Sequence, residues 1–179
     1  DLQGVKLRVG KVKNDTQKIR YNQKFIFDNN KKIGNSNRIN FAYPNIIKKL
    51  KKGNKILIDD GKFTFLVKSR NKNSVITVCK SQNCFIRSNK SIHIQNLDIS
   101  FNKLTYKDKK DISSAIKLGC NWIALSYIQN EKIINQTRKL IKKDIGIISK
   151  IENKHAIKNI INIIKATDSI MIARGDLAI

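Results

Sequence analysis

The second half of the chain alternates short apolar runs with amphipathic segments, and this pattern limits its fold more than any other feature. Three apolar runs, WIALSYI, IGIIS and SIMIA, begin at Trp122, Ile145 and Ser169. Segments with apolar residues at helical spacing lie before and between them, at 105–118, 131–143 and 154–166. Strands that are apolar on both faces and alternate with such helices are typical of a parallel sheet covered by helices. We therefore predict three buried strands in an α/β arrangement.

Polar residues follow the apolar runs at regular intervals. They are Ser126 and Tyr127 at the end of the first run, Lys150 and Glu152 after the second, and Arg174 and Asp176 after the third. The carboxyl ends of parallel strands lie together, both in a (β/α) barrel and in an open doubly wound sheet. The spacing therefore predicts one shared site but leaves the closure of the sheet open.

The residue types at this site suit a hard divalent cation. Mg²⁺ commonly takes one or two carboxylates together with substrate oxygens, and Glu152 and Asp176 would supply two. Lys150 lies two residues before Glu152, on the same face of an extended chain, and Gly175 allows close approach of the backbone to a ligand. With Arg174 they could hold a phosphorylated substrate. The competing interpretation is that both carboxylates cap helices and pair with the two cations.

The first half of the chain has a different pattern, with brief β-prone runs separated by clusters of Asn, Gly, Ser and Asp. The clearest runs are Tyr21–Asp28, Lys55–Ile58, Lys62–Lys68 and Ser74–Cys79. The Asp59-Asp60-Gly61 sequence between two of them is a typical hairpin turn. We predict a small all-β module for this half.

The formal net charge of +24 raises the possibility of nucleic-acid binding. Only seven of the 37 basic residues are arginine, however, and the lysines are spread along the whole chain. Aromatic residues are not interleaved with them, so the sequence shows no base-stacking platform. We therefore attribute the charge to compositional bias and expect no nucleic-acid partner, although a basic nucleic-acid-associated protein stays an alternative.

Other features indicate a protein of the cytoplasm. No apolar run approaches the ~18 residues of a membrane helix, so we expect no membrane partner. Cys79, Cys84 and Cys120 are odd in number and form no C-x-x-C pair, which favours reduced thiols. Because the chain starts at Asp1 and stops after an apolar run at Ile179, we expect it to be cut from a longer protein.

Several motifs resemble the pyruvate kinase family. The most specific are SKIEN at Ser149–Asn153 and IMIARGDL at Ile170–Leu177. Four others occur in family order: DLQGVKLR at Asp1–Arg8, IDDGKF at Ile58–Phe63, KDKKDI at Lys107–Ile112 and GCNWIALSYI at Gly119–Ile128. The resemblance implies phosphoryl transfer from phosphoenolpyruvate to ADP, giving pyruvate and ATP. The alternative enzyme is another Mg²⁺-dependent barrel acting on enolates.

The resemblance also implies roles for individual residues. Glu152 and Asp176 match the Mg²⁺ ligands, and Mn²⁺ can substitute for Mg²⁺. Lys150 matches the lysine that stabilises the phosphoryl group and the developing enolate. The remaining matches are Ala173, Arg174, Gly175 and Asp176 for the substrate, Arg8 as a catalytic and nucleotide-phosphate contact, Lys90 for the nucleotide, and Asp1 for K⁺.

Some positions depart from the family pattern. Lys6 stands where members that need K⁺ usually have a glutamate, and Leu2 where they have a threonine. Because a lysine ammonium could supply the missing positive charge, we predict activity without K⁺. The hinge segment Lys90–Asn96 lacks the usual glycines and proline, and other replacements are Val5, Tyr127, Gln129 and Ala178.

The fold implied by the resemblance is part of a TIM-type (β/α)8 barrel with an inserted small all-β barrel domain. Residues 1–4 would end a barrel strand, 5–102 would form the inserted lid, and 103–179 would form middle β/α units of the barrel. We expect the fragment alone to be inactive and the full-length protein to be a homotetramer. A relative that has lost catalysis is a further alternative, although the intact SKIEN and ARGDL motifs favour an active enzyme.

Overall fold

The computed structural model describes residues 1–95, 97, 99–141 and 144–177. The chain forms two compact units: an α/β unit, made of Asp1–Lys6 with Ser100–Ile179, and a β unit, Leu7–Ile99. The corresponding boundaries predicted from the sequence are 4/5 and 102/103. The last residue of the predicted hinge, Asn96, and the replacement at Ala178 lie outside the described residues.

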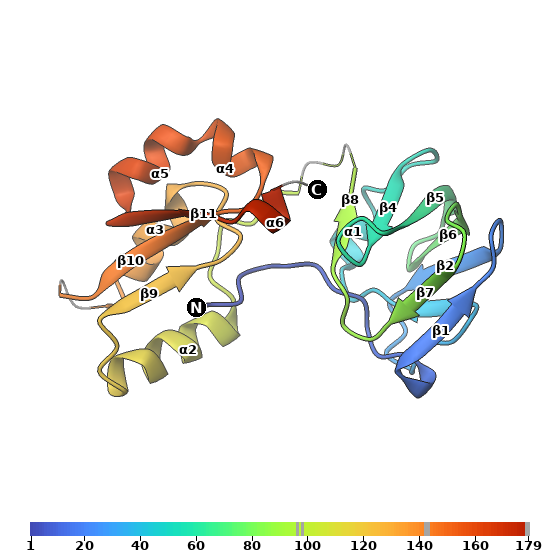
Figure 1. Ribbon diagram of the computed structural model, residues 1–179, viewed down its shortest axis with the longest axis horizontal. Coiled ribbons are helices and arrows are strands. Elements are labelled where there is room, and N and C mark those ends of the chain that lie inside the picture. Colours follow the sequence, from blue (N-terminus) through green and yellow to red (C-terminus); the bar gives the residue numbers. More distant parts are fainter. Residues whose placement is uncertain (96, 98, 142–143, 178–179) are drawn as a thin grey trace. The chain divides into compact units, whose positions relative to one another are not determined.

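The α/β unit contains a three-stranded parallel sheet (Figure 1). Its strands are β9 (Trp122–Leu125), β10 (Gly146–Ile151) and β11 (Ser169–Ile172), with β10 in the middle. The helices are α2 (Tyr106–Lys117), α3 (Glu131–Arg138), α4 (Lys154–Lys158), α5 (Ile160–Ala166) and α6 (Arg174–Leu177). The parallel α/β arrangement predicted from hydrophobic periodicity is therefore confirmed.

Local sequence explains where the first two of these helices begin and end. The Thr105 side chain accepts a hydrogen bond from the Asp108 backbone, and the Asp108 side chain accepts one from the Thr105 backbone, so α2 begins with a capping box. After α2, Gly119 has a φ of +70°, which favours glycine. The Asn130 side chain caps α3. This helix ends at Arg138 rather than at the predicted Lys143, which lies outside the described residues.

The predicted helix 154–166 is in fact two helices, because Asn159 has a non-helical ψ of +16°. Its side chain donates a hydrogen bond to the Gln129 carbonyl oxygen at 2.9 Å. Asparagine has a low helix propensity, and here its side chain bonds to a residue 30 positions away rather than within the helix. The break therefore separates α4 from α5.

The core of the α/β unit fills the space between the sheet and its helices. Its fully buried members include Ile128, Ile134, Ile147, Ala156 and Ile163. The prediction that all three strands are buried is wrong for β11, in which every residue is exposed. Among the described strands β11 pairs only with β10, so it lies at an edge of the sheet, where burial is incomplete.

The regular secondary structure of the β unit is mainly strand (Figure 1). A six-stranded sheet has the order β3-β2-β6-β5-β4-β8, and β1 pairs with β7 in a second, two-stranded sheet. The bounds are β1 (Thr16–Ile19), β2 (Lys24–Asp28), β3 (Arg38–Asn40), β4 (Lys55–Ile58), β5 (Phe63–Arg70), β6 (Ser74–Cys79), β7 (Cys84–Arg87) and β8 (Ile92–Ile94). Two short helical segments complete it, η1 (Lys13–Asp15) and α1 (Pro44–Ile47).

Aromatic side chains form the centre of the β unit. Phe25, Phe27 and Phe65 are fully buried, with ring centroids 5.3–5.5 Å apart. The hairpin predicted around Asp59-Asp60-Gly61 is confirmed, since Ile58 pairs with Phe63 across the turn. Such aromatic contacts contribute about 0.5–1.5 kcal/mol each beyond their buried area.

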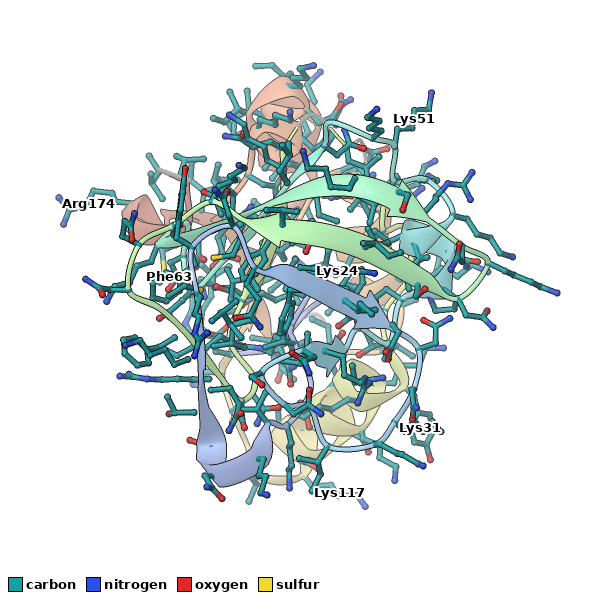
Figure 2. All side chains as sticks on the ribbon, turned by 90° about the vertical axis from the view of Figure 1, so that its right-hand side faces the viewer. Lys24, Lys31, Lys51, Phe63, Lys117 and Arg174 are labelled. Atoms are coloured by element: carbon teal, nitrogen blue, oxygen red, sulfur yellow. The ribbon has the colours of Figure 1, made fainter. Side chains whose placement is uncertain are left out.

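Lysine side chains lie on separate parts of the surface. Lys24 on β2, Lys31 in the loop after β2 and Lys51 in the loop before β4 are all exposed, and Figure 2 shows them at separate places. The basic charge is thus dispersed in the folded β unit as it is along the sequence. No helix in the described part of the chain is long and apolar enough to cross a membrane.

Candidate active site at the strand ends

Charged side chains meet at the carboxyl ends of the parallel strands in the α/β unit. Lys150 Nζ lies 2.9 Å from Glu152 Oε1 and 3.1 Å from Asp1 Oδ2. Lys6 Nζ lies 2.5 Å from Asp176 Oδ1. The structure therefore brings together Asp1, Lys150 and Glu152, and it pairs Asp176 with a lysine near the other end of the unit's sequence.

Glu152 is held as a buried carboxylate, with only 3% of its surface exposed. Its Oε2 accepts a hydrogen bond from the Tyr127 backbone N–H at 2.7 Å, in a turn where Tyr127 has a φ of +58°. The helix-capping interpretation of Glu152 is wrong, because Asn153 caps α4 by accepting from the N–H groups of His155 and Ala156. The second carboxylate oxygen, Oε1, faces Lys150.

The sequence suggested that Lys150 follows the second strand. In the structure Lys150 lies within β10. Its ammonium also donates to Ser126 Oγ at 3.1 Å, and Ser126 Oγ donates to Asp1 Oδ1 at 2.9 Å. Asp1 is placed by the next residue: Leu2 forms a parallel bridge with Leu125, at the end of β9. Residues 1 and 2 thus extend the parallel sheet by one short segment.

Gly4 and Asp108 support this arrangement but were not predicted to belong to the site. The Gly4 N–H donates to Asp108 Oδ1 at 3.2 Å. Gly4 has a φ of +62°, and a Cβ added there would lie 2.3 Å from the Ser126 carbonyl oxygen. The only sequence signal was the capping pattern at Thr105, which indicates a helix start and not a contact with Gly4.

The end of β11 carries the residues that match the ARGDL motif. Ala173 N–H donates to the Ile151 carbonyl oxygen at 3.1 Å, and Asp176 lies in the first turn of α6. A Cβ on Gly175 would meet open space. Arg174 extends into solvent (Figure 2), with no hydrogen bond or ion pair to any residue that the structure describes. The competing interpretation, in which both cations pair with carboxylates, therefore holds for Lys150 but not for Arg174 among these residues.

The pKa of the Tyr127 hydroxyl is affected by the carboxylates of the site. Burial and the nearby carboxylates of Asp176 and Glu152 raise the pKa of its hydroxyl to about 12. Each of these effects disfavours the phenolate form. Tyr127 thus stays neutral across the physiological pH range, close to both carboxylates.

Arg8 and Lys90, the other two predicted site residues, lie in the β unit. Arg8 donates to the Asn89 carbonyl oxygen at 2.9 Å and forms an antiparallel bridge with Ser91. Lys90 Nζ lies 2.8 Å from Asp59 Oδ1. These contacts place both cations beside the segment that leads into β8.

The donor set in the α/β unit fits a hard divalent cation that keeps part of its water shell. The described residues contain no group of three or more His, Cys, Asp or Glu side chains that could enclose a metal. Glu152 and Asp176 offer carboxylate oxygens, and Mg²⁺ usually takes one or two of these, with water and substrate oxygens completing its shell. An ammonium beside each carboxylate offsets its charge in the metal-free arrangement.

Comparison with known proteins gives a consistent result. The family model described as pyruvate kinase, barrel domain, matches residues 1–179. The pyruvate kinase of Methylorubrum extorquens is 30% identical over 179 residues, covering all of this chain and 37% of the relative. That of Mycoplasma genitalium is 34% identical over 190 residues, with the same two coverages.

Structural similarity leads to the same family. A crystal structure of a pyruvate kinase from Cryptosporidium parvum matches with a TM-score of 0.83 and 26% identity, over 98% of this chain and 38% of that one. The chain thus spans less than two fifths of the length of these relatives. On the strength of the family model, the relatives and the fold, the chain belongs to the pyruvate kinase family.

Proposed function

We propose that this chain is the central part of a pyruvate kinase, which transfers a phosphoryl group from phosphoenolpyruvate to ADP and produces pyruvate and ATP. The observation that carries the proposal is the convergence of Lys150, Glu152 and Asp176, from the two family motifs, at the ends of adjacent parallel strands. In β/α folds this edge is where catalytic groups collect.

Glu152 and Asp176 would hold Mg²⁺, with Mn²⁺ as a substitute. A cation bound there would supply positive charge to the phosphate oxygens during transfer. The Tyr127 N–H donates a hydrogen bond to Glu152, so the buried carboxylate would already have one orientation before the cation binds. Such fixed groups need little reorganisation when charge moves.

Lys150 would stabilise the transferring phosphoryl group and the enolate oxygen of pyruvate. Its side chain is only 17% exposed, and its ammonium contacts Asp1, Ser126 and Glu152. Because it is anchored on β10, it offers a positive charge at a fixed position. Arg174, Gly175 and Ala173 would border the substrate, and the open space beside Gly175 supports this role.

We propose that the β unit is the inserted lid of the family and that the α/β unit is part of its (β/α)8 barrel. The proposed limits are 1–4 and 103–179 for the barrel parts, and 5–102 for the lid. Arg8 and Lys90 would contact phosphates of the substrate and nucleotide. Their guanidinium and ammonium groups lie on neighbouring parts of the β unit, held by Asn89 and Asp59, which supports this assignment.

We also propose that Lys6 takes the place of K⁺, as the sequence predicted. Its contact with Asp176 supports the idea, because the ammonium lies beside a proposed metal ligand. Asp1, which matches a K⁺ ligand of the family, instead contacts Lys150 and Ser126.

The complete protein would act in the cytoplasm as a homotetramer, which light scattering can test.

The proposal is tested by a coupled pyruvate-forming assay on the complete natural chain. The chain offers a matched pair of variants, because Glu152 and Glu131 are its only glutamates. We expect Glu152→Gln to lower kcat by about a hundred- to a thousandfold, as loss of a charge-stabilising group does, and Glu131→Gln to have little effect.

Three results would contradict this proposal: no turnover by a folded wild type, an equal loss in both variants, or full activity of Glu152→Gln. The 179-residue chain alone is expected to be inactive. A measured turnover from the purified fragment would contradict that expectation.

A further inference from the structure

Asp108 is a buried carboxylate outside the proposed catalytic and metal-binding residues. It is 2% exposed, and the described residues include no salt bridge that involves it. Its partners are instead neutral donors: Thr105 N–H at 3.1 Å, Thr105 Oγ1 at 2.6 Å and Gly4 N–H at 3.2 Å. A buried carboxylate must be hydrogen-bonded, so each of these contacts matters for its burial.

The two contacts with Thr105 have an ordinary explanation, whereas the contact with Gly4 does not. Thr105 and Asp108 form the capping box of α2, which needs only Asp108 Oδ2. The other oxygen, Oδ1, accepts a hydrogen bond from the Gly4 N–H, which lies 104 residues away in the sequence. A residue that only starts a helix would not need this second partner.

Gly4 lies in the middle of the segment that supplies two charged residues to the site. Three residues before it, Asp1 contacts Lys150 and Ser126; two residues after it, Lys6 contacts Asp176. The segment bends at Gly4, whose φ is +62° and whose α-carbon faces the Ser126 carbonyl oxygen too closely for a side chain. The hydrogen bond that the Gly4 N–H donates to Asp108 therefore holds this segment at its bend.

We infer that Asp108 is a positioning residue for the proposed metal site, because it fixes the segment that places Asp1 and Lys6. It acts through the backbone of Gly4 and touches neither substrate nor metal. The inference rests on the proposed function only in naming the site as a metal site. The link between Asp108 and the placement of residues 1–6 can be tested without it.

The test compares Asp108→Asn with two controls on the same helix, in the complete natural chain. In Asp108→Asn, an amide that keeps its oxygen toward Thr105 presents its N–H₂ to the Gly4 N–H, so the link to Gly4 is lost. Thr105→Ala removes the hydroxyl group from the capping box but keeps the backbone N–H that donates to Asp108 Oδ2, and it leaves the contact between Gly4 and Asp108 Oδ1 unaltered. Asp111→Asn removes a carboxylate that pairs with Lys107 at the surface, with no contact to Gly4.

Three quantities are measured: amide hydrogen exchange at Gly4, Mn²⁺ affinity by water-proton relaxation, and the free energy of unfolding in urea. We expect Asp108→Asn to speed Gly4 exchange and to weaken Mn²⁺ binding about tenfold or more, the scale for groups that orient metal ligands. Thr105→Ala should lower the free energy of unfolding without changing Mn²⁺ affinity, and Asp111→Asn should change neither.

Equal Mn²⁺ affinity in Asp108→Asn and wild type would overturn the inference, as would equal losses in Asp108→Asn and Thr105→Ala. If Asp108→Asn does not fold, wild-type hydrogen exchange decides: a Gly4 amide that exchanges as fast as an exposed one overturns the link. A wild type that binds no Mn²⁺ but protects Gly4 would refute the proposed metal site and leave the hydrogen bond from Gly4 to Asp108 in place.

Discussion

Lys6 Nζ and Asp176 Oδ1 lie 2.5 Å apart, although 170 residues separate them in the sequence. Their side chains are 21% and 25% exposed, so the pair is partly shielded from solvent. A charge pair in such surroundings interacts more strongly than one in open water. The proposed metal site thus contains a fixed positive charge supplied by the protein itself.

The first prediction concerns this charge. Turnover of the complete wild-type enzyme should be unchanged when K⁺ is replaced by a large organic cation. Lys6→Met should lower kcat about tenfold or more, because a fixed cation beside developing negative charge is lost. The turnover of Lys6→Glu should rise when K⁺ is added. Lys154→Met, on the exposed start of α4, is the control. A strict K⁺ requirement in the wild type would defeat the prediction.

The second prediction concerns the bend at Gly4. Gly4→Ala forces a side chain into a left-handed conformation, which costs about 1–2 kcal/mol, and also places Cβ against the Ser126 carbonyl oxygen. Gly119→Ala is a matched control, since Gly119 has a φ of +70° and open space around it. Urea unfolding should therefore show a larger loss for Gly4→Ala than for Gly119→Ala. Equal losses would mean that the close approach to Ser126 contributes nothing.

The sequence predicted the parts of this molecule that depend on local pattern. Hydrophobic periodicity located α2, β9 and β10, because burial of one helix face or of a strand leaves a regular apolar spacing. The exposure of β11 escaped prediction, since an apolar run does not reveal which strand lies at the edge of a sheet. Asn159 also escaped it, because a single hydrogen bond from its side chain accompanies the break in the helix.

In the candidate site too, some features could be predicted from the sequence and others could not. Glu152 and Asp176 follow apolar runs, so their place at strand ends could be predicted from spacing alone. The contact between Gly4 and Asp108 could not, because it joins a backbone N–H to a helix cap 104 residues away. No local pattern indicates such a contact, since any residue except proline would carry the same N–H group at position 4.

The third prediction concerns the pH dependence of stability. A hydrogen bond from Arg138 and one from the Ile147 N–H lower the pKa of Asp168 below its usual value of 3.8. Because the folded pKa is depressed, the stabilisation is present above pH 3.8 and is lost as the pH falls through the lower folded value. Asp168→Asn should thus cost on the order of 1 kcal/mol at pH 7, a small figure because the side chain is 42% exposed.

Urea unfolding across the pH range measures this effect. The difference between wild type and Asp168→Asn should shrink toward zero below the folded pKa, where the carboxyl group is protonated in both states. Above the folded pKa, this difference should also be smaller when Arg138 is already replaced by glutamine. A difference that stays constant down to pH 2 would show that the ionised carboxylate is not its source.

The last prediction concerns the three free cysteines. A hydrogen bond with Cys84 and one with the Ser81 backbone lower the pKa of the Cys79 thiol to about 7, although burial opposes this shift. Thiolate character would make Cys79 reactive, yet Cys79 and Cys84 are both fully buried while Cys120 is exposed. Since a thiolate must be accessible to react, we expect solvent access, not thiolate character, to determine which cysteine reacts.

In the native chain, a maleimide should therefore label one cysteine quickly, and mass spectrometry of peptides should place the label on Cys120. Cys120→Ser should remove the fast phase, leaving two thiols that react only after unfolding in guanidinium chloride. If rapid labelling persists in Cys120→Ser and falls on Cys79, the strands β6 and β7 open readily in solution. Thiolate character, rather than burial, would then determine reactivity in the β unit.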